Sequence, residues 1–362
     1  MRRFSSFIVV LTVCAGSAFA SNALAADKTV SPEVRLAILK HAQIWAPTNV
    51  ASKNIKAGPR GPGAFAPESV VTCDYVDEKL SGNSPKFACE LGKADEVKVK
   101  YGATNGEVYA GVAATRLLWA LGFGADRFYP VRIVCRNCPA ELPGGTPIDH
   151  AVKFDVAAIE RKLVGREIKT AGGEGWAWAE LDLVDRTAGG APRAHRDALK
   201  LVAALLQHTD NKPEQQRLVC LDAENAKQKG KRDNCAHPFM YIHDVGLTFG
   251  EGHWLNQQDV GSVNLERWAR APVWREGERC VANVHASVTG SLEHPPISEE
   301  GRAFLAGLLA KLSDAQLRDL FEVARFSRRG VDESGHTSNG TVDDWVAAFK
   351  KKRAEIADRR CT

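Results

Sequence analysis

The hydrophobic pattern of the chain changes its period part of the way along the sequence. Up to about residue 186 apolar residues mostly alternate with polar ones, as in strands, whereas from residue 193 they recur at helical spacing. Strands are predicted over 69–76, 86–91, 96–102, 127–135, 151–163 and 176–184, and helices over 31–45, 106–121, 193–207, 298–312, 313–326 and 341–357. The sequence therefore predicts an α+β protein with a strand-rich part over 26–186 and a helical part over 187–362.

The first 25 residues have the features of a signal peptide. Arg2 and Arg3 precede an uncharged stretch, and Ala23 and Ala25 supply the small residues that a signal peptidase reads. We therefore expect residues 1–25 to be removed and the protein to be secreted or periplasmic. No later stretch is apolar enough to span a bilayer, so no membrane contact is expected after cleavage.

The charge pattern argues against a nucleic-acid partner. The formal net charge is only +4, and no basic patch is interleaved with aromatic residues. The basic run near residues 348–360 follows helical spacing and is interpreted as a solvated helix face.

The cysteines agree with an oxidising compartment. Of nine cysteines, Cys14 leaves with the signal peptide, which leaves the even number that a disulfide framework needs. We considered the pairs Cys73 with Cys89 and Cys220 with Cys235, but eight cysteines allow 105 connectivities. Cys135 and Cys138 are read as a structural disulfide or as partners of distant cysteines; a redox pair or half of a zinc site is the alternative.

The stretch that carries chemistry is "HTDNKPEQQ", residues 208–216. It follows a helix and precedes a strand, and a second strand further on ends at "HDVG", which contains Asp244. Two strands that flank one loop place Asp210 and Asp244 near one end of a small hairpin. Two such carboxylates suit a general base and a metal ligand.

This stretch resembles the catalytic loop of the protein-kinase-like superfamily, and Asp244-x-Gly246 resembles the metal-binding motif that follows it. The resemblance implies a two-lobed kinase-like fold with a strand-rich N-lobe and a helical C-lobe, in this case a divergent, secreted member stabilised by disulfides. It also implies that Asp210 is the catalytic base, that Lys212 steadies the transferred group and that Asp244 holds a metal. Gln215 stands where the family has a second metal-binding Asn.

The same resemblance extends to the strand before the first long helix. Lys98 or Lys100 is then the nucleotide lysine, and Glu107 at the start of the helix is its partner. No Gly-x-Gly-x-x-Gly precedes them, and the turn around Gly82 is the candidate phosphate loop. The implied cofactor is ATP with Mg²⁺ or Mn²⁺.

Three functions are compatible with these residues. The first is nucleotide-dependent transfer of a phosphoryl or nucleotidyl group to an unknown protein or small-molecule acceptor. The second is an inactive, pseudokinase-like binding module. The third is a metal-dependent hydrolase that uses Asp210, Asp244 and His243 around one ion.

Overall fold

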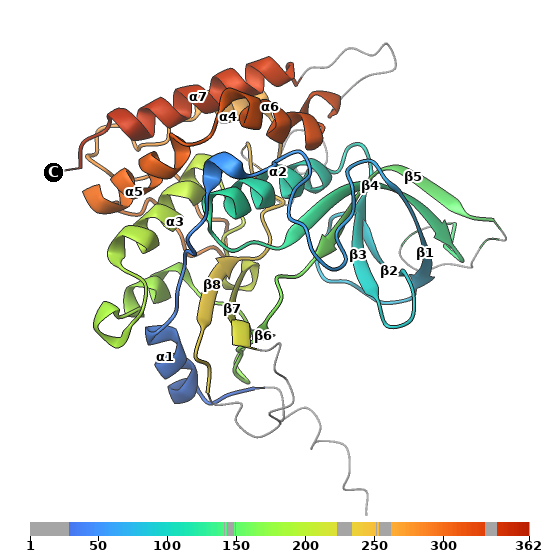
Figure 1. Ribbon diagram of the computed structural model, residues 1–362, viewed down its shortest axis with the longest axis horizontal. Coiled ribbons are helices and arrows are strands. Elements are labelled where there is room, and N and C mark those ends of the chain that lie inside the picture. Colours follow the sequence, from blue (N-terminus) through green and yellow to red (C-terminus); the bar gives the residue numbers. More distant parts are fainter. Residues whose placement is uncertain are drawn as a thin grey trace, which may run out of the picture.

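The computed structural model confirms the mixed α+β composition. It describes residues 29–140, 142, 148, 150–222, 234–250, 252, 262–329 and 339–361. The expected signal peptide, 1–25, therefore lies outside the described residues, as does the basic insertion at 227–232. Figure 1 shows a barrel of strands at one side of the molecule and most of the helices at the other, with helix α2 between them.

Five strands close into the barrel. They are β1 (Val70–Val76), β2 (Lys86–Glu90), β3 (Glu96–Tyr101), β4 (Arg127–Arg136) and β5 (Val152–Arg161), joined in the order β1-β2-β3-β5-β4. The β1–β4 pair is parallel, and the other pairs are antiparallel. The predicted alternation places one side chain in two inside the barrel, where a separate apolar cluster forms.

Helix α2 (Gly106–Leu121) connects the barrel to the rest of the fold. The Asn105 side chain caps its first turn, and Gly122 ends it with a left-handed φ of 89°. The helix packs against β4 on one side and against α6 on the other. Because it is buried almost throughout, its first residues have a fixed position above the end of β3.

A second sheet contains β6 (Arg166–Glu167), β7 (Gln216–Cys220) and β8 (Pro238–Ile242). Strands β7 and β8 pair antiparallel, with Gln216 opposite Ile242. This register confirms the predicted hairpin and brings the start of β7 next to the end of β8.

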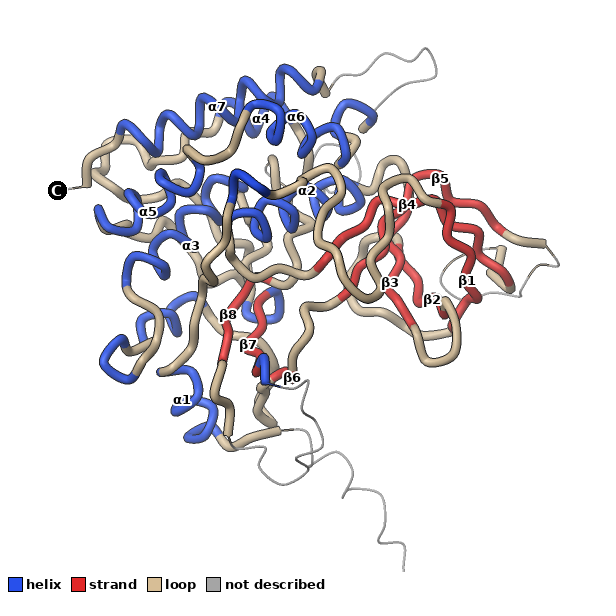
Figure 2. Tube along the Cα trace, viewed as in Figure 1, coloured by secondary structure: helices blue, strands red, loops and turns tan. Residues whose placement is uncertain are grey.

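The remaining helices pack mainly on one another (Figure 2), and together with this sheet they contribute to the largest apolar core of the described residues. Their starts are capped as predicted by Ser298, Ser313 and Thr341. These α-helices are α1 (Pro32–Lys40), α3 (Arg193–Leu206), α4 (Leu265–Arg270), α5 (Glu299–Leu309), α6 (Asp314–Val323) and α7 (Val342–Asp358). Shorter 3-10 helices span Val50–Ser52, Trp178–Leu183, Arg186–Ala188, Pro213–Gln215 and Phe326–Arg328.

The strand predicted over 176–184 is wrong, because the structure has a 3-10 helix there. Trp176 and Trp178 are nevertheless buried, and the Trp176 indole N–H donates to the Arg217 carbonyl at 3.0 Å. Tertiary packing of the two indoles, with Glu180 accepting from the Ala177 amide at 2.8 Å, outweighs the strand propensity of the segment.

Parts of the first half of the chain lie against the second sheet. Residue Gln43, after α1, pairs in parallel with Phe239 of β8, and β6 pairs with β7. The division of the chain at residue 186 stays a prediction.

Four disulfides join the eight cysteines that follow residue 25. Cys73–Cys89 and Cys220–Cys235 match the pairs considered from the sequence, and Cys135–Cys138 is a local structural bridge. The fourth bridge, Cys280–Cys361, ties α7's end to the loop before α5. This pattern is consistent with an oxidising, extracellular location. None of the described helices is both long and apolar enough to cross a membrane.

Candidate functional site

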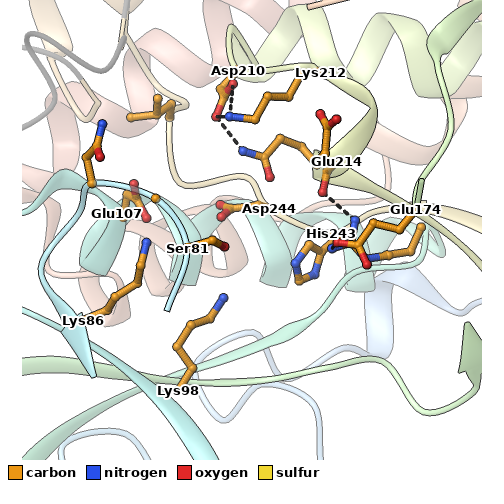
Figure 3. Close-up of a pocket in the computed structure, with 15 residues that line it drawn as sticks. Ser81, Lys86, Lys98, Glu107, Glu174, Asp210, Lys212, Glu214, His243 and Asp244 are labelled. Carbon is orange, nitrogen blue, oxygen red and sulfur yellow. Dashed lines mark hydrogen bonds and ion pairs between the residues drawn. The ribbon is translucent and has the colours of Figure 1, made fainter. Parts of the chain in front are cut away.

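A cavity of about 420 Å³ lies between the barrel and the second sheet (Figure 3). Its lining comes from the β1–β2 turn, from β2 and β3, from the start of α2, and from the loops that flank β7 and β8. The predicted site residues that line it are Gly82, Lys98, Glu107, Asp210, Lys212, Gln215 and Asp244, together with His243. The structure thus brings together residues that are up to 162 positions apart, from Gly82 to Asp244.

Lys100 lies directly behind this lining and links the barrel to the end of β8. Its ammonium is 2.6 Å from Glu107 Oε2 and 3.4 Å from Asp244 Oδ2. A third carboxylate, Glu160 of β5, is 3.8 Å away. Lys100 has no exposed surface, so these carboxylates replace the water that an ammonium normally binds.

The charges of this cluster stabilise one another. Burial alone would lower the pKa of Lys100, but the negative charges of Asp244, Glu107 and Glu160 outweigh it and raise that pKa. Burial alone would raise the pKa of Asp244, but Lys100, Lys98 and other donors hold it well below its usual range. Lys100 is therefore a cation and Asp244 an anion across the physiological pH range.

The neighbouring lysines face the cavity instead. Lys98 pairs with Glu160 at 2.5 Å and keeps a quarter of its side chain exposed. Lys86 also lines the cavity, and burial, followed by repulsion from Lys100, lowers its pKa. Of the two predicted nucleotide lysines, Lys100 pairs with Glu107, the partner that the resemblance implies, whereas Lys98 is exposed to the cavity.

The β1–β2 turn covers the cavity from the barrel side. Gly82 has a left-handed φ of 85°, and a Cβ atom there would lie 2.7 Å from the Lys86 ammonium. Ser84, just beyond it, donates to Glu107 Oε2 at 3.0 Å. The turn is therefore tied to the start of α2.

On the opposite wall, Asp210 is held by two side chains of its own loop. The Gln215 amide nitrogen donates to Asp210 Oδ2 at 2.6 Å, and the Lys212 ammonium lies 3.3 Å from the same carboxylate. The backbone carbonyl of Gln215 accepts from the amides of His243 and Asp244, at 2.7 and 3.2 Å. These bonds connect the two loops that carry the predicted base and the predicted metal ligand.

Asn211 fixes the position of this loop, although the sequence reasoning gave it no role. It is fully buried, and its Oδ1 accepts from the amides of Ser291 and Leu292 at 2.9 and 3.0 Å. Its Nδ2 donates to the carbonyls of His208 and Leu292 at 3.0 and 3.2 Å. Nothing in the local pattern predicts this contact, because residues 291–292 are 80 positions away.

Two histidines adjoin the predicted acidic pair. His208 is fully buried, and burial lowers its pKa to about 4 despite the nearby charges of Asp210 and Asp244. His243 Nδ1 lies 2.6 Å from Asp126 Oδ2, and the same carboxylate accepts from the Tyr241 hydroxyl at 3.0 Å. Asp126, like Glu160, was missed from the sequence, where it is an isolated acidic residue before a strand.

The charges that line the cavity are nearly balanced. Four cationic side chains (Lys86, Lys98, Lys212 and Arg217) face five carboxylates (Glu107, Glu174, Asp210, Glu214 and Asp244). A polyphosphate would meet both signs, and a divalent cation would offset its repulsion from the carboxylates. The carboxylate of Asp244 and the amide oxygen of Gln215 are hard oxygen donors of the kind that Mg²⁺ and Mn²⁺ prefer, so the chemistry of these two residues fits such an ion.

Comparisons with known proteins give little beyond this geometry. No protein-family profile matches the chain, and no curated protein matches it in sequence. Among solved structures, a Helicobacter pylori proinflammatory kinase, CtkA, is similar with a TM-score of 0.43 and 11% identity, over 81% of this chain and 96% of that chain. At that level of similarity the kinase-like fold stays a prediction.

Proposed function

We propose that this protein is a kinase-like transferase that moves a phosphoryl or nucleotidyl group from a metal-bound nucleotide to an acceptor. The observation that carries the proposal is the buried Lys100–Glu107–Asp244 cluster, which adjoins the same cavity as Asp210. An ion-paired lysine, an acidic metal ligand and a separate carboxylate base are the parts that phosphoryl transfer requires.

Each wall of the cavity has its own role in this proposal. Lys98 and Lys86 bind phosphate oxygens from the barrel side, while Lys100 keeps Asp244 ionised and in place. The divalent ion, held by Asp244 and Gln215, would neutralise charge on the phosphates. Asp210, oriented by Gln215 and Lys212, accepts the proton of the acceptor hydroxyl.

The two-lobed arrangement and the secreted or periplasmic location belong to the same proposal. In this arrangement the barrel with α2 is the nucleotide-binding lobe, and the second sheet with its helices is the catalytic lobe. The four disulfides and the predicted signal peptide support export.

Thermal melts of the mature chain test the binding part of this proposal. Mg²⁺ or Mn²⁺ with ATP, compared with metal alone, should raise the melting temperature of the wild type and not that of Asp244→Asn. A ligand at a hundred times its Kd stabilises a protein by about 2.7 kcal/mol, which such melts resolve. The matched control is Glu174→Gln, which removes another carboxylate of the cavity but should keep the nucleotide shift. Equal shifts in the wild type and in Asp244→Asn would contradict the proposed metal ligand.

An inactive binding module is the second candidate, and the orientation of Gln215 favours it. The Gln215 amide N–H donates to Asp210, so the Gln215 side chain points toward the predicted base. A nucleotide-dependent melting shift without any product would select this candidate. The metal-dependent hydrolase stays a prediction, and turnover of a substrate without nucleotide would select it.

A further inference from the structure

A group of potential metal ligands lies on the loop that supports residues 208–211. His285, Glu293 and His294 each offer a ligand atom, and these atoms lie within 4.8 Å of one another. The two histidine rings have their centroids 4.4 Å apart. This group lies outside the cavity described above.

Two of the three distances between the ligand atoms match a tetrahedral zinc site. Glu293 Oε1 is 3.4 Å from His285 Nδ1 and 3.3 Å from His294 Nε2. Zinc bonds of about 2.05 to 2.1 Å in a tetrahedron place neighbouring ligand atoms about 3.4 Å apart. Two imidazoles and one carboxylate form a common ligand set for zinc, which leaves a fourth position for water.

The backbone already holds the Glu293 side chain and the base of the loop in place. Glu293 Oε2 accepts from the Ala286 amide at 2.5 Å, so Oε1 is the oxygen that faces both histidines. The His294 amide donates to the Val284 carbonyl at 3.0 Å, which closes the loop at its base. Glu293, which lies between the two histidines, is therefore preorganised as a metal ligand.

Two other groups of potential metal ligands among the described residues are less suited to bind a metal, because their side chains already have partners. In the group of Cys220, Asp222 and Cys235, the two cysteines form a disulfide. In the group of Asp126, Glu160 and His243, Asp126 accepts three hydrogen bonds and Glu160 is paired with Lys98 and Lys100.

We propose that His285, Glu293 and His294 bind one Zn²⁺ ion, or a divalent transition metal of similar preference, and that this ion clamps the loop over 285–294. The loop is the one that Asn211 holds through the amides of Ser291 and Leu292, and its Ser287 amide also donates to the Thr209 carbonyl at 2.9 Å. Metal binding thus stiffens the support of the Asp210 loop. This inference does not depend on the proposed transferase activity.

Zinc titration of tag-free, chelator-treated mature protein tests the site, with a chromophoric chelator as competitor. The wild type should bind one equivalent, and His285→Gln and Glu293→Gln should each weaken that binding at least tenfold. His285 is two-thirds exposed, so its replacement should leave the metal-free melting temperature unchanged. Glu293→Gln keeps an acceptor oxygen for the Ala286 amide.

Two control variants separate this site from other places where zinc could bind. His237→Gln removes another exposed histidine that is paired with a carboxylate, and Asp244→Asn alters the cavity. Both variants should still bind one equivalent of zinc. The site would be overturned if Asp244→Asn lost zinc binding while His285→Gln kept it. Absence of saturable zinc binding in the wild type would overturn it as well.

Hydrogen exchange tests the clamp separately. Zinc should slow exchange of the Ser291 and Leu292 amides at least threefold in the wild type and not in His285→Gln. Unchanged exchange in a wild type that binds zinc would overturn the clamp.

Discussion

Replacing Lys100 with Met removes the cation from the buried cluster and nearly preserves side-chain length. Glu107, Asp244 and Glu160 would then lose a shared countercharge, in a place where water replaces it poorly. Removing one partner of a buried ion pair costs about 3 to 5 kcal/mol. Asp244 is a quarter exposed and Glu160 keeps Lys98, so we expect a loss near the lower end, about 3 kcal/mol of unfolding free energy.

Lys98→Met is the matched control for this change. Lys98 lies two residues earlier on the same face of β3, but it is a quarter exposed, and among the described residues it forms an ion pair only with Glu160. Glu160 would retain Lys100 at 3.8 Å. We expect a loss of about 1 kcal/mol or less, because the pair is partly solvated.

Urea denaturation at pH 7 measures both losses, and its pH dependence tests their origin. The lowered pKa of Asp244 contributes stability that is present above its unfolded pKa and lost as the pH falls toward the folded pKa. Without Lys100 this contribution is absent, so the difference in unfolding free energy between wild type and variant should stay nearly constant from pH 7 to about pH 4 and should narrow below about pH 4. A Lys100→Met loss that is below 1 kcal/mol, equal to that of Lys98→Met, or independent of pH would refute the electrostatic account.

Three further predictions concern parts that position the site. Asn211→Ala should lower the unfolding free energy by about 3 kcal/mol, because two backbone amides lose their acceptor. Calorimetric melting measures this loss, and a loss under 1 kcal/mol would contradict the anchoring role of Asn211. Replacing both Cys280 and Cys361 with Ala should lower the unfolding free energy by about 4 kcal/mol, since the bridge spans a sequence separation of 81. An unchanged urea midpoint would show that the bridge does not stabilise the fold. Ser313→Ala should cost about 1 kcal/mol by removing the cap of α6, whereas Ser313→Thr, which keeps a hydroxyl, should have a smaller effect on the same melt.

The barrel strands and the β7–β8 hairpin could be predicted because each has a sequence signal with a direct physical cause. A strand with one face inside a barrel alternates in polarity. Asp210 precedes β7 and Asp244 follows β8, so antiparallel pairing of these strands places both residues at the same end of the hairpin. The hairpin signal predicted that both carboxylates lie near one end of the hairpin, and both line the cavity.

Other features depend on contacts that the local pattern does not contain. Lys98 and Lys100 share a face of β3, so periodicity could not distinguish them; the position of Glu107 at the start of α2 decides which is buried. Glu160 looks like any charged residue near a strand end, yet it is paired with both lysines. The strand predicted around Trp178 failed because the burial of its indole depends on residues from distant elements.

Product formation from ATP tests the central claim most directly. The mature protein should be incubated with ATP and Mg²⁺ or Mn²⁺, with water and its own hydroxyl groups as acceptors, and nucleotides should be quantified by chromatography. We predict ADP or AMP formation by the wild type that falls at least a hundredfold in Asp210→Asn, while the nucleotide-dependent melting shift of that variant persists. Equal product formation by Asp210→Asn, or no product from a wild type that binds the nucleotide, would contradict the assignment of a transferase.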